Sequence, residues 1–539
     1  MASQEKHFYA EQLRTRIEAT LATGAHRVLL SDESAQWTGQ EIAEKIRALR
    51  ASVEILTDKN SFVGIAFPNS ATQALAVLAV ITSGRVPVML SFADLQSEVK
   101  AWARRSQASL FLTSPLPELR QQREVPALFL NDQGDIDSPS PTLGNDVPPR
   151  TRHENAPDLA AGTALVLFTS GSTGVPKSVR VPAEGLLATV DFLAPYFGLG
   201  SDTVAPVTLP ICHSMALNTQ FLPTFLSGGR CHFMNTRLSL SRLYRTILDQ
   251  RGTFVSLIGE TLNMCWQERT RKKLSAAETV RHVQLAGGLI VPRHLEMAME
   301  LFPNALIHKG YGLTEAIRVT MIDQRDLDFD SSSVGWPLPF NQVEVRADGK
   351  VLTEPHETGE IHVKGPNVHL GTGSFFTPVV DARGYLATGD LGHWNARGQL
   401  CVLGRKDGQL RINGQWVSSF EIEKIALQTS SSIINAKCLA VADERRGTSK
   451  MVLLLEIPPD FQSHFLREEI GLVQRDIATQ LHRLPHFPKE IAIFDRFPRT
   501  SNGKLAVSQL TKLYLNSPKS VICDNPYSSL QFFRVEAAA

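Results

Sequence analysis

The stretch FTSGSTGVPKS, from Phe168 to Ser178, follows the short apolar run ALVL at 164–167, which is typical of a buried strand. Ser, Thr, Gly and Pro are common turn formers, so the stretch could be an ordinary loop. It could equally cradle a phosphate, because glycines let backbone N–H groups approach an anion, hydroxyls add donors and a lysine adds charge. The stretch alone does not decide between a plain loop and a phosphate site.

Three known phosphate-binding patterns do not fit this stretch. A Walker A loop needs a second glycine where Pro176 stands. A Rossmann GxGxxG pattern fails because Ser172 and Thr173 separate Gly171 from Gly174. A kinase glycine-rich loop is also absent from the sequence. A nucleotide-phosphate loop of another kind remains open.

The composition bounds the class of protein. With 539 residues, 43% hydrophobic and 20% charged, the chain predicts a globular protein with more than one core. Basic and acidic residues number 55 and 54, which gives no electrostatic argument for binding nucleic acid or an anionic membrane. The six cysteines are scattered without CxxC spacing, which favours reduced thiols in a cytoplasmic protein. The most apolar segment, 74–82, is too short to span a bilayer and predicts a buried helix.

Strand-like apolar runs alternate with helix-like stretches, which predicts an α/β fold with mostly parallel sheets. The clearest strand candidates are 62–67, 108–114, 164–170 and 283–288. From about Val334, short strands with Gly turns predict a small β-rich subdomain. After Arg405 the pattern alternates again and includes a helix-like stretch near 465–484. We therefore expect two domains, residues 1–404 and residues 405–539.

Four further motifs follow along the chain, and each is weak alone. GYGLTEA at 310–316 places an aromatic ring, a hydroxyl and a carboxylate within five residues. TGDLG at 388–392 sets an aspartate in a glycine turn, and GRKDGQLRINGQWVSSFEIE at 404–423 joins an arginine, an aspartate and a glycine-rich reversal. PRTSNGKL at 498–505 places a lysine on a glycine turn. Together with the opening stretch, in this order and spacing, they resemble the adenylate-forming superfamily of acyl-CoA synthetases, nonribosomal-peptide adenylation domains and luciferases. The resemblance covers roughly residues 30–512.

The resemblance implies a fold, cofactors and a set of site residues. The implied fold is a large N-terminal α/β domain with a β-subdomain, followed by a small mobile α+β C-terminal domain. The implied cofactors are ATP and Mg²⁺, and the opening stretch becomes the ATP phosphate loop. The residues implied to bind ATP are Thr169, Ser170, Gly171, Ser172, Thr173, Gly174, Lys177, Gly287, Gly288, Tyr311, Gly312, Asp390, Arg405 and Asp407. The implied catalytic residues are Lys504, Glu315, Thr314 and His213, and the implied Mg²⁺ ligands are Glu315 and Thr173.

The resemblance also implies a role for each group around the nucleotide. Tyr311 would stack on adenine, which needs a flat π surface. Thr314 would bond the α-phosphate, and Glu315 would hold Mg²⁺, which prefers carboxylate and phosphate oxygens. Asp390 would accept hydrogen bonds from the ribose hydroxyls, and Arg405 would assist at the ribose or the phosphates.

Lys504 and Asp407 belong to the implied two-step reaction. Lys504 would lie between the acyl carboxylate and the α-phosphate, where a cation offsets the repulsion of two anions. The C-terminal domain would then swing about Asp407, and a thiol would attack the acyl-adenylate and release AMP. We expect coenzyme A as the acceptor, with the phosphopantetheine of a carrier protein or an amine as alternatives, and a homodimer stays open. A non-catalytic nucleotide-binding protein, or phosphoryl transfer that yields ADP, would be a rival from another class.

Three positions depart from the family pattern. Ser178 stands where glycine usually follows the loop lysine, PAEG at 182–185 replaces a histidine, and Trp416 stands where a basic or polar residue is usual. These departures put the second step in question, above all the acceptor.

The pocket for the acid is expected beside the segments 209–218 and 256–264. They offer His213, Met215, Asn218, Ile258, Gly259 and Glu260. The small residues Ser256, Gly259, Gly287 and Gly310 suggest space for a sizeable acid. A carboxylate such as Glu260 is costly in an apolar pocket, so it would either recognise an amino or hydroxyl group of the acid, face solvent or cap a helix.

Overall fold

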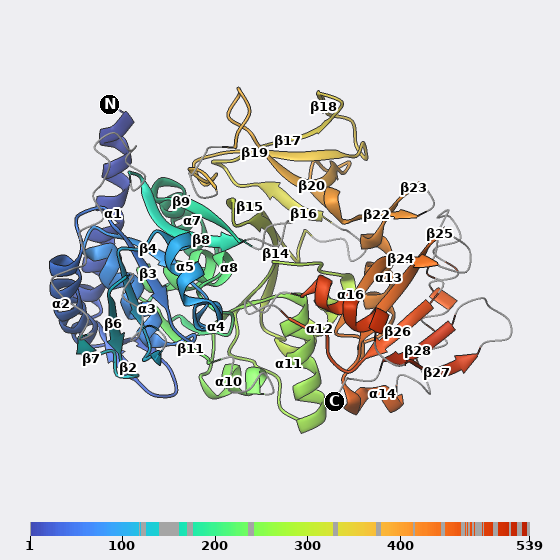
Figure 1. Cartoon of the computed structure of the whole chain (residues 1–539), viewed down its shortest axis with the longest axis horizontal. Coiled ribbons are helices and arrows are strands. Elements are labelled where there is room, and N and C mark those ends of the chain that lie inside the picture. The colour runs from blue at the N-terminus through green and yellow to red at the C-terminus, as the bar shows by residue number, and fades with distance from the viewer. Residues whose placement is uncertain are drawn as a thin grey trace.

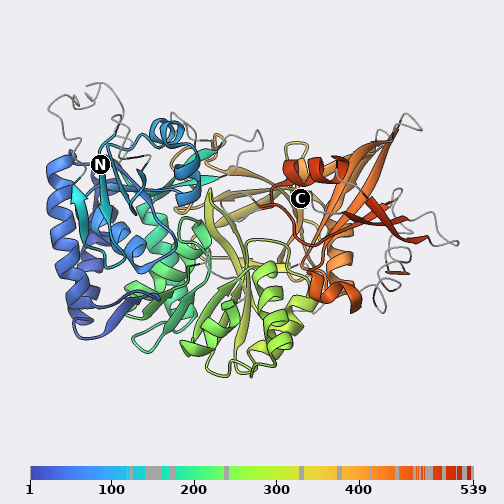
Figure 2. The same ribbon diagram turned by 60° about the horizontal axis from the view of Figure 1, so that its bottom comes forward.

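The computed structural model shows a mixed α/β molecule whose parts follow one another in sequence order (Figure 1). The N-terminal elements, drawn in blue, lie at one end and the C-terminal elements, in orange and red, at the other, and the view of Figure 2 agrees. The described residues are 2–117, 119, 125–139, 161–169, 176–235, 242–326, 333–372, 379–412, 415–443, 448–464, 469, 472, 475–476, 479, 488, 490–499, 505–516, 519–524 and 531–535. Within these ranges, no helix is both long enough and apolar enough to cross a membrane.

A seven-stranded sheet forms the N-terminal part, in the order β7-β6-β5-β3-β4-β8-β9. Its strands are β3 (Phe62–Ala66), β4 (Val86–Met89), β5 (Leu110–Thr113), β6 (Ala127–Leu130), β7 (Ile136–Pro139), β8 (Thr163–Thr169) and β9 (Lys177–Pro182). The helices beside it are α1 (Ala2–Thr23), α2 (Gly39–Leu56), α3 (Ala71–Thr82), α4 (Phe92–Ser97), α5 (Val99–Ser106) and α7 (Ala183–Tyr196). The five central strands are parallel, and the edge strands β7 and β9 are antiparallel. Leu112 packs with α1, α2 and α3, whereas its neighbour Phe111 packs with α5 on the other face, so these strands need apolar residues throughout.

A ten-stranded sheet forms the middle of the molecule, in the order β12-β13-β14-β15-β16-β21-β20-β19-β17-β18. Its strands are β12 (Phe254–Leu257), β13 (His282–Leu285), β14 (Leu306–Leu313), β15 (Ala316–Asp323), β16 (Ser333–Pro337), β17 (Gln342–Ala347), β18 (Lys350–Leu352), β19 (Gly359–Lys364), β20 (Leu386–Trp394) and β21 (Leu400–Arg405). The associated helices are α10 (Leu243–Asp249), α11 (Gly259–Lys272) and α12 (Pro292–Leu301). β12, β13 and β14 are parallel, and the later pairs are antiparallel. A separate four-stranded sheet has the order β10 (Val204–Val207), β11 (Arg230–Phe233), β1 (Val28–Ser31) and β2 (Gln36–Thr38).

The C-terminal part contains a five-stranded sheet in the order β24-β25-β26-β28-β27. Its elements are α13 (Ser419–Thr429), β24 (Asn435–Asp443), β25 (Thr448–Glu456), α14 (Pro459–His464), β26 (Glu490–Phe494), α16 (Val507–Asn516), β27 (Lys519–Asp524) and β28 (Gln531–Val535). A hairpin of β22 (Gln409–Ile412) and β23 (Gln415–Ser418) precedes them. Val291, at the start of α12, is buried in the same apolar cluster as Ile422 and Ile425 of α13. The C-terminal part therefore packs directly against α12.

The structure confirms the main sequence-based expectations of secondary structure. The predicted strands at 62–67, 108–114, 164–170 and 283–288 correspond to β3, β5, β8 and β13. Every residue of α3 is buried, as the apolar run at 74–82 predicts. The region after Val334 is rich in strands, but they continue the sheet of β12–β14. The helix expected near 465–484 lies largely outside the described residues.

Candidate active site

The hairpin of β8 and β9 positions the two ends of the stretch FTSGSTGVPKS. Thr169 lies opposite Lys177, so the ends of the intervening turn meet at the edge of the sheet. The predicted phosphate-loop residues Ser170, Gly171, Ser172, Thr173 and Gly174 lie outside the described residues. Lys177 is exposed at the start of β9.

A crossing segment joins this hairpin to the turn that carries Thr314 and Glu315. The backbone N–H of Leu370 donates to the carbonyl of Arg180 in β9 (2.9 Å), and the N–H of His369 donates to the carbonyl of Glu315 (2.9 Å). The turn itself connects the antiparallel strands β14 and β15. The structure thus connects the Glu315 turn to β9, which ends the stretch FTSGSTGVPKS, through two adjacent residues of the crossing segment.

Tyr311, Asp390 and Arg405 form one hydrogen-bonded group. The Tyr311 hydroxyl donates to Asp390 Oδ2 at 2.6 Å, and Arg405 Nη1 lies 3.5 Å from Asp390 Oδ1. Burial raises the pKa of Asp390, against the opposing effects of Tyr311 and Arg405. Burial and the neighbouring Asp390 raise the pKa of Tyr311 well above its ordinary value, so the phenol keeps its proton and fixes the carboxylate. The group therefore offers the aromatic ring of Tyr311 for stacking and the buried carboxylate of Asp390 as a hydrogen-bond acceptor.

Arg405 also links the site to the segment expected to act as the hinge. Its Nη1 donates to the carbonyl of Thr388 (3.0 Å), and its Nε donates to Asp407 Oδ1 (3.2 Å). Burial disfavours the charged guanidinium, but Asp407, Asp390 and Glu315 together raise the pKa of Arg405. Arg405 is therefore an ion-pair partner of Asp390 in β20 and of Asp407 at the start of the C-terminal part, and Glu315 adds a smaller electrostatic effect.

The expected acid pocket is partly assembled. Gly287 has φ +79°, and a Cβ there would lie 3.1 Å from Ile258 Cγ2 and 3.3 Å from Met215 Sδ, so the three residues converge. Next to Gly288, by contrast, there is open space for a side chain. The expectation of free space at Gly310 and Gly259 is wrong. A Cβ on Gly310 would lie 2.2 Å from Arg318 Nη1, and one on Gly259 would lie 2.7 Å from His294 Cε1, so those side chains already fill the space.

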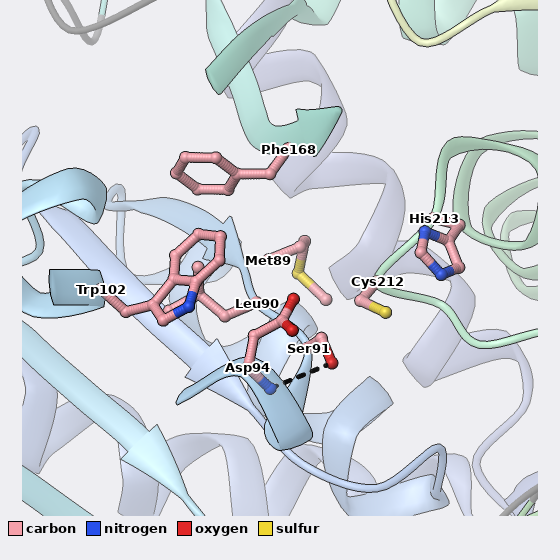
Figure 3. Close-up of a pocket in the computed structure, with 8 residues that line it drawn as sticks. All are labelled: Met89, Leu90, Ser91, Asp94, Trp102, Phe168, Cys212 and His213. Carbon is pink, nitrogen blue, oxygen red and sulfur yellow. Dashed lines mark hydrogen bonds between the residues drawn. The ribbon is translucent and has the colours of Figure 1, made fainter. Parts of the chain in front are cut away.

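His213 lines a small pocket beside the phosphate stretch (Figure 3). The other lining residues are Met89, Leu90, Ser91, Asp94, Trp102, Phe168 and Cys212. The rings of Trp102 and Phe168 meet edge to face with centroids 5.0 Å apart. Burial, with a smaller effect of Glu98, raises the pKa of Asp94 to about 6. Asp94 and Trp102 were not predicted as pocket residues, because only folding brings the segment after β4 under Phe168.

Glu260 neither faces solvent nor caps a helix. It lies in the first turn of α11, after the N-cap residue Ile258, and pairs with Arg499 at 2.5 Å. Arg499 also pairs with Glu456 of β25 at 2.8 Å. Burial raises the pKa of Glu260 to about 7, an effect that Arg499 opposes. Arg499 is the second residue of the motif PRTSNGKL. The motif indicates a functional segment, but nothing in the sequence indicates that this arginine pairs with Glu260.

Lys504 lies outside the described residues, but the residues on either side of its segment, Arg499 and Leu505, are described. Arg499 and Leu505 form an isolated antiparallel bridge, and the N–H of Ala506 donates to the carbonyl of Pro498 at 2.9 Å. The described residues contain no cluster of three metal-ligating side chains. Glu315 fits Mg²⁺ in the way the ion is usually held with nucleotides, by one or two carboxylates and the substrate phosphates.

Comparison with known proteins identifies the family. A family model described as "AMP-binding enzyme" matches residues 17–371, and the chain belongs to this family. The chain is 25% identical to 4-coumarate–CoA ligase-like 2 of Arabidopsis thaliana over 363 residues, which are 65% of this chain but only 61% of that protein. It is 25% identical to 2-succinylbenzoate–CoA ligase of Bacillus pumilus over 89% of this chain and 93% of that protein.

Solved structures confirm the fold. The amide bond synthetase McbA from Marinactinospora thermotolerans superposes with a TM-score of 0.74 at 20% identity, over 93% of this chain and 99% of that one. The expected adenylate-forming-enzyme fold is therefore correct for this chain.

Proposed function

We propose that this protein uses ATP to convert a carboxylic acid into an acyl-adenylate with release of pyrophosphate, and then passes the acyl group to a thiol. The observation that carries the proposal is the Tyr311–Asp390–Arg405 group beside the Glu315 turn. It supplies a ring for a base and a buried acceptor for ribose hydroxyls next to the phosphate-loop flanks.

The residues of the chain divide the work of the first step. Tyr311 orients the nucleotide base, and Asp390 holds the sugar hydroxyls. Lys177 and the loop amides are proposed to neutralise the leaving pyrophosphate, and Lys504 is proposed to offset the repulsion between the acid and the α-phosphate. Glu315 would hold the Mg²⁺ that accompanies ATP, and the ion would supply positive charge to the phosphates.

The second step needs a change in the position of the C-terminal part. We propose that residues 1–404 and residues 405–539 are the two moving domains and that Asp407 is the hinge. The thiol is proposed to be that of coenzyme A, because the curated relatives named above are CoA ligases. A carrier-protein phosphopantetheine or an amine is the alternative, and the structural neighbour named as an amide bond synthetase supports testing an amine. A cytoplasmic location is part of the proposal, and it accords with free thiols at Cys231 and Cys265.

ATP–pyrophosphate exchange across a panel of acids tests the first step. We expect exchange with at least one class of acid, AMP as the product, and a loss of about 10²–10³-fold in rate in Lys504→Ala with ATP binding retained. ADP as the product, or unchanged exchange in Lys504→Ala, would contradict the mechanism. Thioester formation with coenzyme A, compared with amide formation from simple amines, then decides the acceptor.

A further inference from the structure

Arg318 is a buried cation without a carboxylate partner. It lies in β15, three residues after Glu315, and only 4% of it is exposed. Within the described part of the chain no carboxylate pairs with it, Tyr196 is the ionisable neighbour that acts on its pKa, and its Nε has no hydrogen-bond partner. Its side-chain contact is a long hydrogen bond of 3.3 Å from Nη2 to Thr219 Oγ1. Burial lowers the pKa of Arg318 to about 10, so it remains charged at neutral pH.

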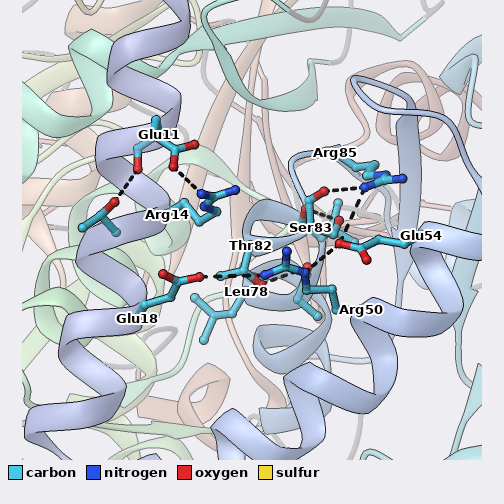
Figure 4. Close-up of polar contacts among 12 residues, drawn as sticks. Glu11, Arg14, Glu18, Arg50, Glu54, Leu78, Thr82, Ser83 and Arg85 are labelled. Carbon is cyan, nitrogen blue, oxygen red and sulfur yellow. Dashed lines mark hydrogen bonds and ion pairs between the residues drawn. The ribbon is translucent and has the colours of Figure 1, made fainter.

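Another buried arginine of the same protein shows how unusual this is. Arg85 is 8% exposed, and it donates to Ser83 O (2.5 Å), Thr57 O (2.7 Å) and Thr57 Oγ1 (3.2 Å). Glu54 also lies 3.9 Å from its Nη1 (Figure 4). Buried charges ordinarily need such compensation, because an unpaired one costs several kcal/mol. Arg85 has this compensation and Arg318 does not.

The guanidinium of Arg318 lies within a polar layer beside the expected acid pocket. Gln284 Nε2 donates to Thr219 Oγ1 (3.0 Å) and to Ser256 Oγ (2.8 Å). The Gln284 Oε1 atom, like Arg318 Nε, has no partner in the described chain. The layer therefore contains buried polar atoms without a hydrogen-bond partner among the described residues, whereas buried polar atoms usually have one.

Thr219 connects this layer to the pocket. It lies in the π-helical turn η1 (Leu217–Phe221), a type of turn often found at functional sites, and its hydroxyl donates to the carbonyl of Met215 at 2.7 Å. The Met215 Sδ atom in turn lies 3.3 Å from the Cβ position of Gly287, where the pocket residues converge. Met215, whose side chain is flexible, therefore connects Thr219 to the place where Ile258 and Gly287 meet.

The backbone holds Arg318 in a strained conformation. Its φ is +46°, in the left-handed region that costs a non-glycine residue free energy. Asn341 and Asn367 stabilise this geometry, since both amide groups donate to the Arg318 carbonyl, at 3.1 and 3.2 Å. Gly310 permits it, because any larger residue would collide with Nη1. Several residues thus keep a cation in this place.

We propose that Arg318 binds a second anionic group on the acid, so that the substrate is a carboxylic acid with a carboxylate, phosphonate or sulfonate at its far end. The inference rests on the proposed acid activation and adds the class of acid. A guanidinium can hold such a group through two parallel hydrogen bonds, and the anion would supply the counter-charge that the protein lacks.

The test compares matched pairs of acids in pyrophosphate exchange. Hexanoate is compared with hexanedioate and octanoate with octanedioate, and an acid with a terminal sulfonate or phosphonate distinguishes the kind of anion.

We expect the native protein to prefer the doubly charged acid by about 10²-fold or more in kcat/KM, because a site with buried donors discriminates strongly against an analogue that leaves them unpaired. Arg318→Met should remove that preference, and Arg318→Lys should retain part of it. Arg85→Met is the matched control, which should leave the preference unchanged.

Direct binding of hexanedioate and octanedioate by calorimetry separates this inference from the proposed function. Binding that is lost in folded Arg318→Met supports the anion site even if no acid supports exchange, a result that would overturn only the adenylation. A preference of the native protein for the acids with an uncharged tail would overturn the anion site. An equal loss of kcat/KM for both acids of each pair in Arg318→Met and in Arg318→Lys would also overturn it.

Discussion

The ion pairs of Arg499 make a quantitative prediction about how the C-terminal part is held. Arg499 serves two buried carboxylates, since its side chain is 13% exposed and those of Glu260 and Glu456 are 16% and 3% exposed. Arg499→Ala would leave both carboxylates buried without their cation. Removing one partner of a buried pair usually costs about 3–5 kcal/mol, and we expect a loss of that size in the free energy of unfolding.

The chain offers a matched control that also joins α11 to the C-terminal part. Arg271 of α11 pairs with Asp460 of α14 at 3.0 Å, but their side chains are 48% and 59% exposed. An exposed pair contributes only about 0–1 kcal/mol, so Arg271→Ala should have little effect. Arg499→Lys should retain most of the stability, because one nitrogen, Nη2, makes both contacts of Arg499 and a lysine supplies one such point charge.

Two measurements check this prediction. Urea denaturation gives the free energy of unfolding of each variant. Hydrogen exchange of the ligand-free protein reports on the interface itself, where Asn263 Nδ2 donates to the carbonyl of Ile434 at 3.3 Å. Arg499→Ala should speed exchange at the start of α11 and near Ile434 far more than Arg271→Ala does. Equal, small effects of the two alanine variants would refute the reasoning.

Three other predictions concern single side chains. Burial raises the pKa of Glu260 from 4.5 to about 7. The stability that its proton contributes is therefore complete below about pH 4.5 and is lost as the pH rises through 7. Glu260→Gln should flatten this pH dependence of the free energy of unfolding, measured by urea denaturation. The pKa of Asp94 is raised to about 6 for the same reason, so Asp94→Asn should increase the free energy of unfolding at pH 8 by about 1–2 kcal/mol and change it little at pH 4. Tyr311→Phe removes the 2.6 Å hydrogen bond to Asp390 and should weaken ATP binding by about 5–10-fold in a titration, with unchanged far-ultraviolet circular dichroism.

Local sequence patterns were sufficient to predict the fold and the family. The parallel strands are short apolar runs, such as FVGIA in β3, because each is buried on both faces. The turn of Thr314 and Glu315 and the turn of Asp390 depend on residues close together in the chain, so a motif can describe them. Where a role depends only on such a local arrangement, the resemblance predicts it.

Contacts between distant elements were not predictable in this way. Glu260 and Arg499 are 239 positions apart in sequence (499 − 260), and nothing local to either residue indicates that they meet. The small residues were misread for the same reason, because Gly310 appears to leave space until Arg318 is placed against it from the neighbouring strand. The sequence did contain one signal, a single charged residue in the buried run AIRVTMI of β15.

Arg318 and the nucleotide group make different demands on a ligand. Tyr311 and Asp390 present chemistry that any nucleotide of this kind requires, and so they suit a whole family. Arg318 suits only a molecule that carries a negative charge where the guanidinium lies, and its burial without a carboxylate partner among the described residues is unfavourable to the folded protein. Asn341 and Asn367 hold this unfavourable buried charge in place. A ligand that pairs with the charge best explains why the protein keeps it. Arg318→Met should therefore stabilise the ligand-free protein in urea denaturation while it weakens binding of the doubly charged acid, because an apolar side chain of similar length removes the uncompensated charge. Loss of stability together with unchanged binding would assign Arg318 a purely structural role.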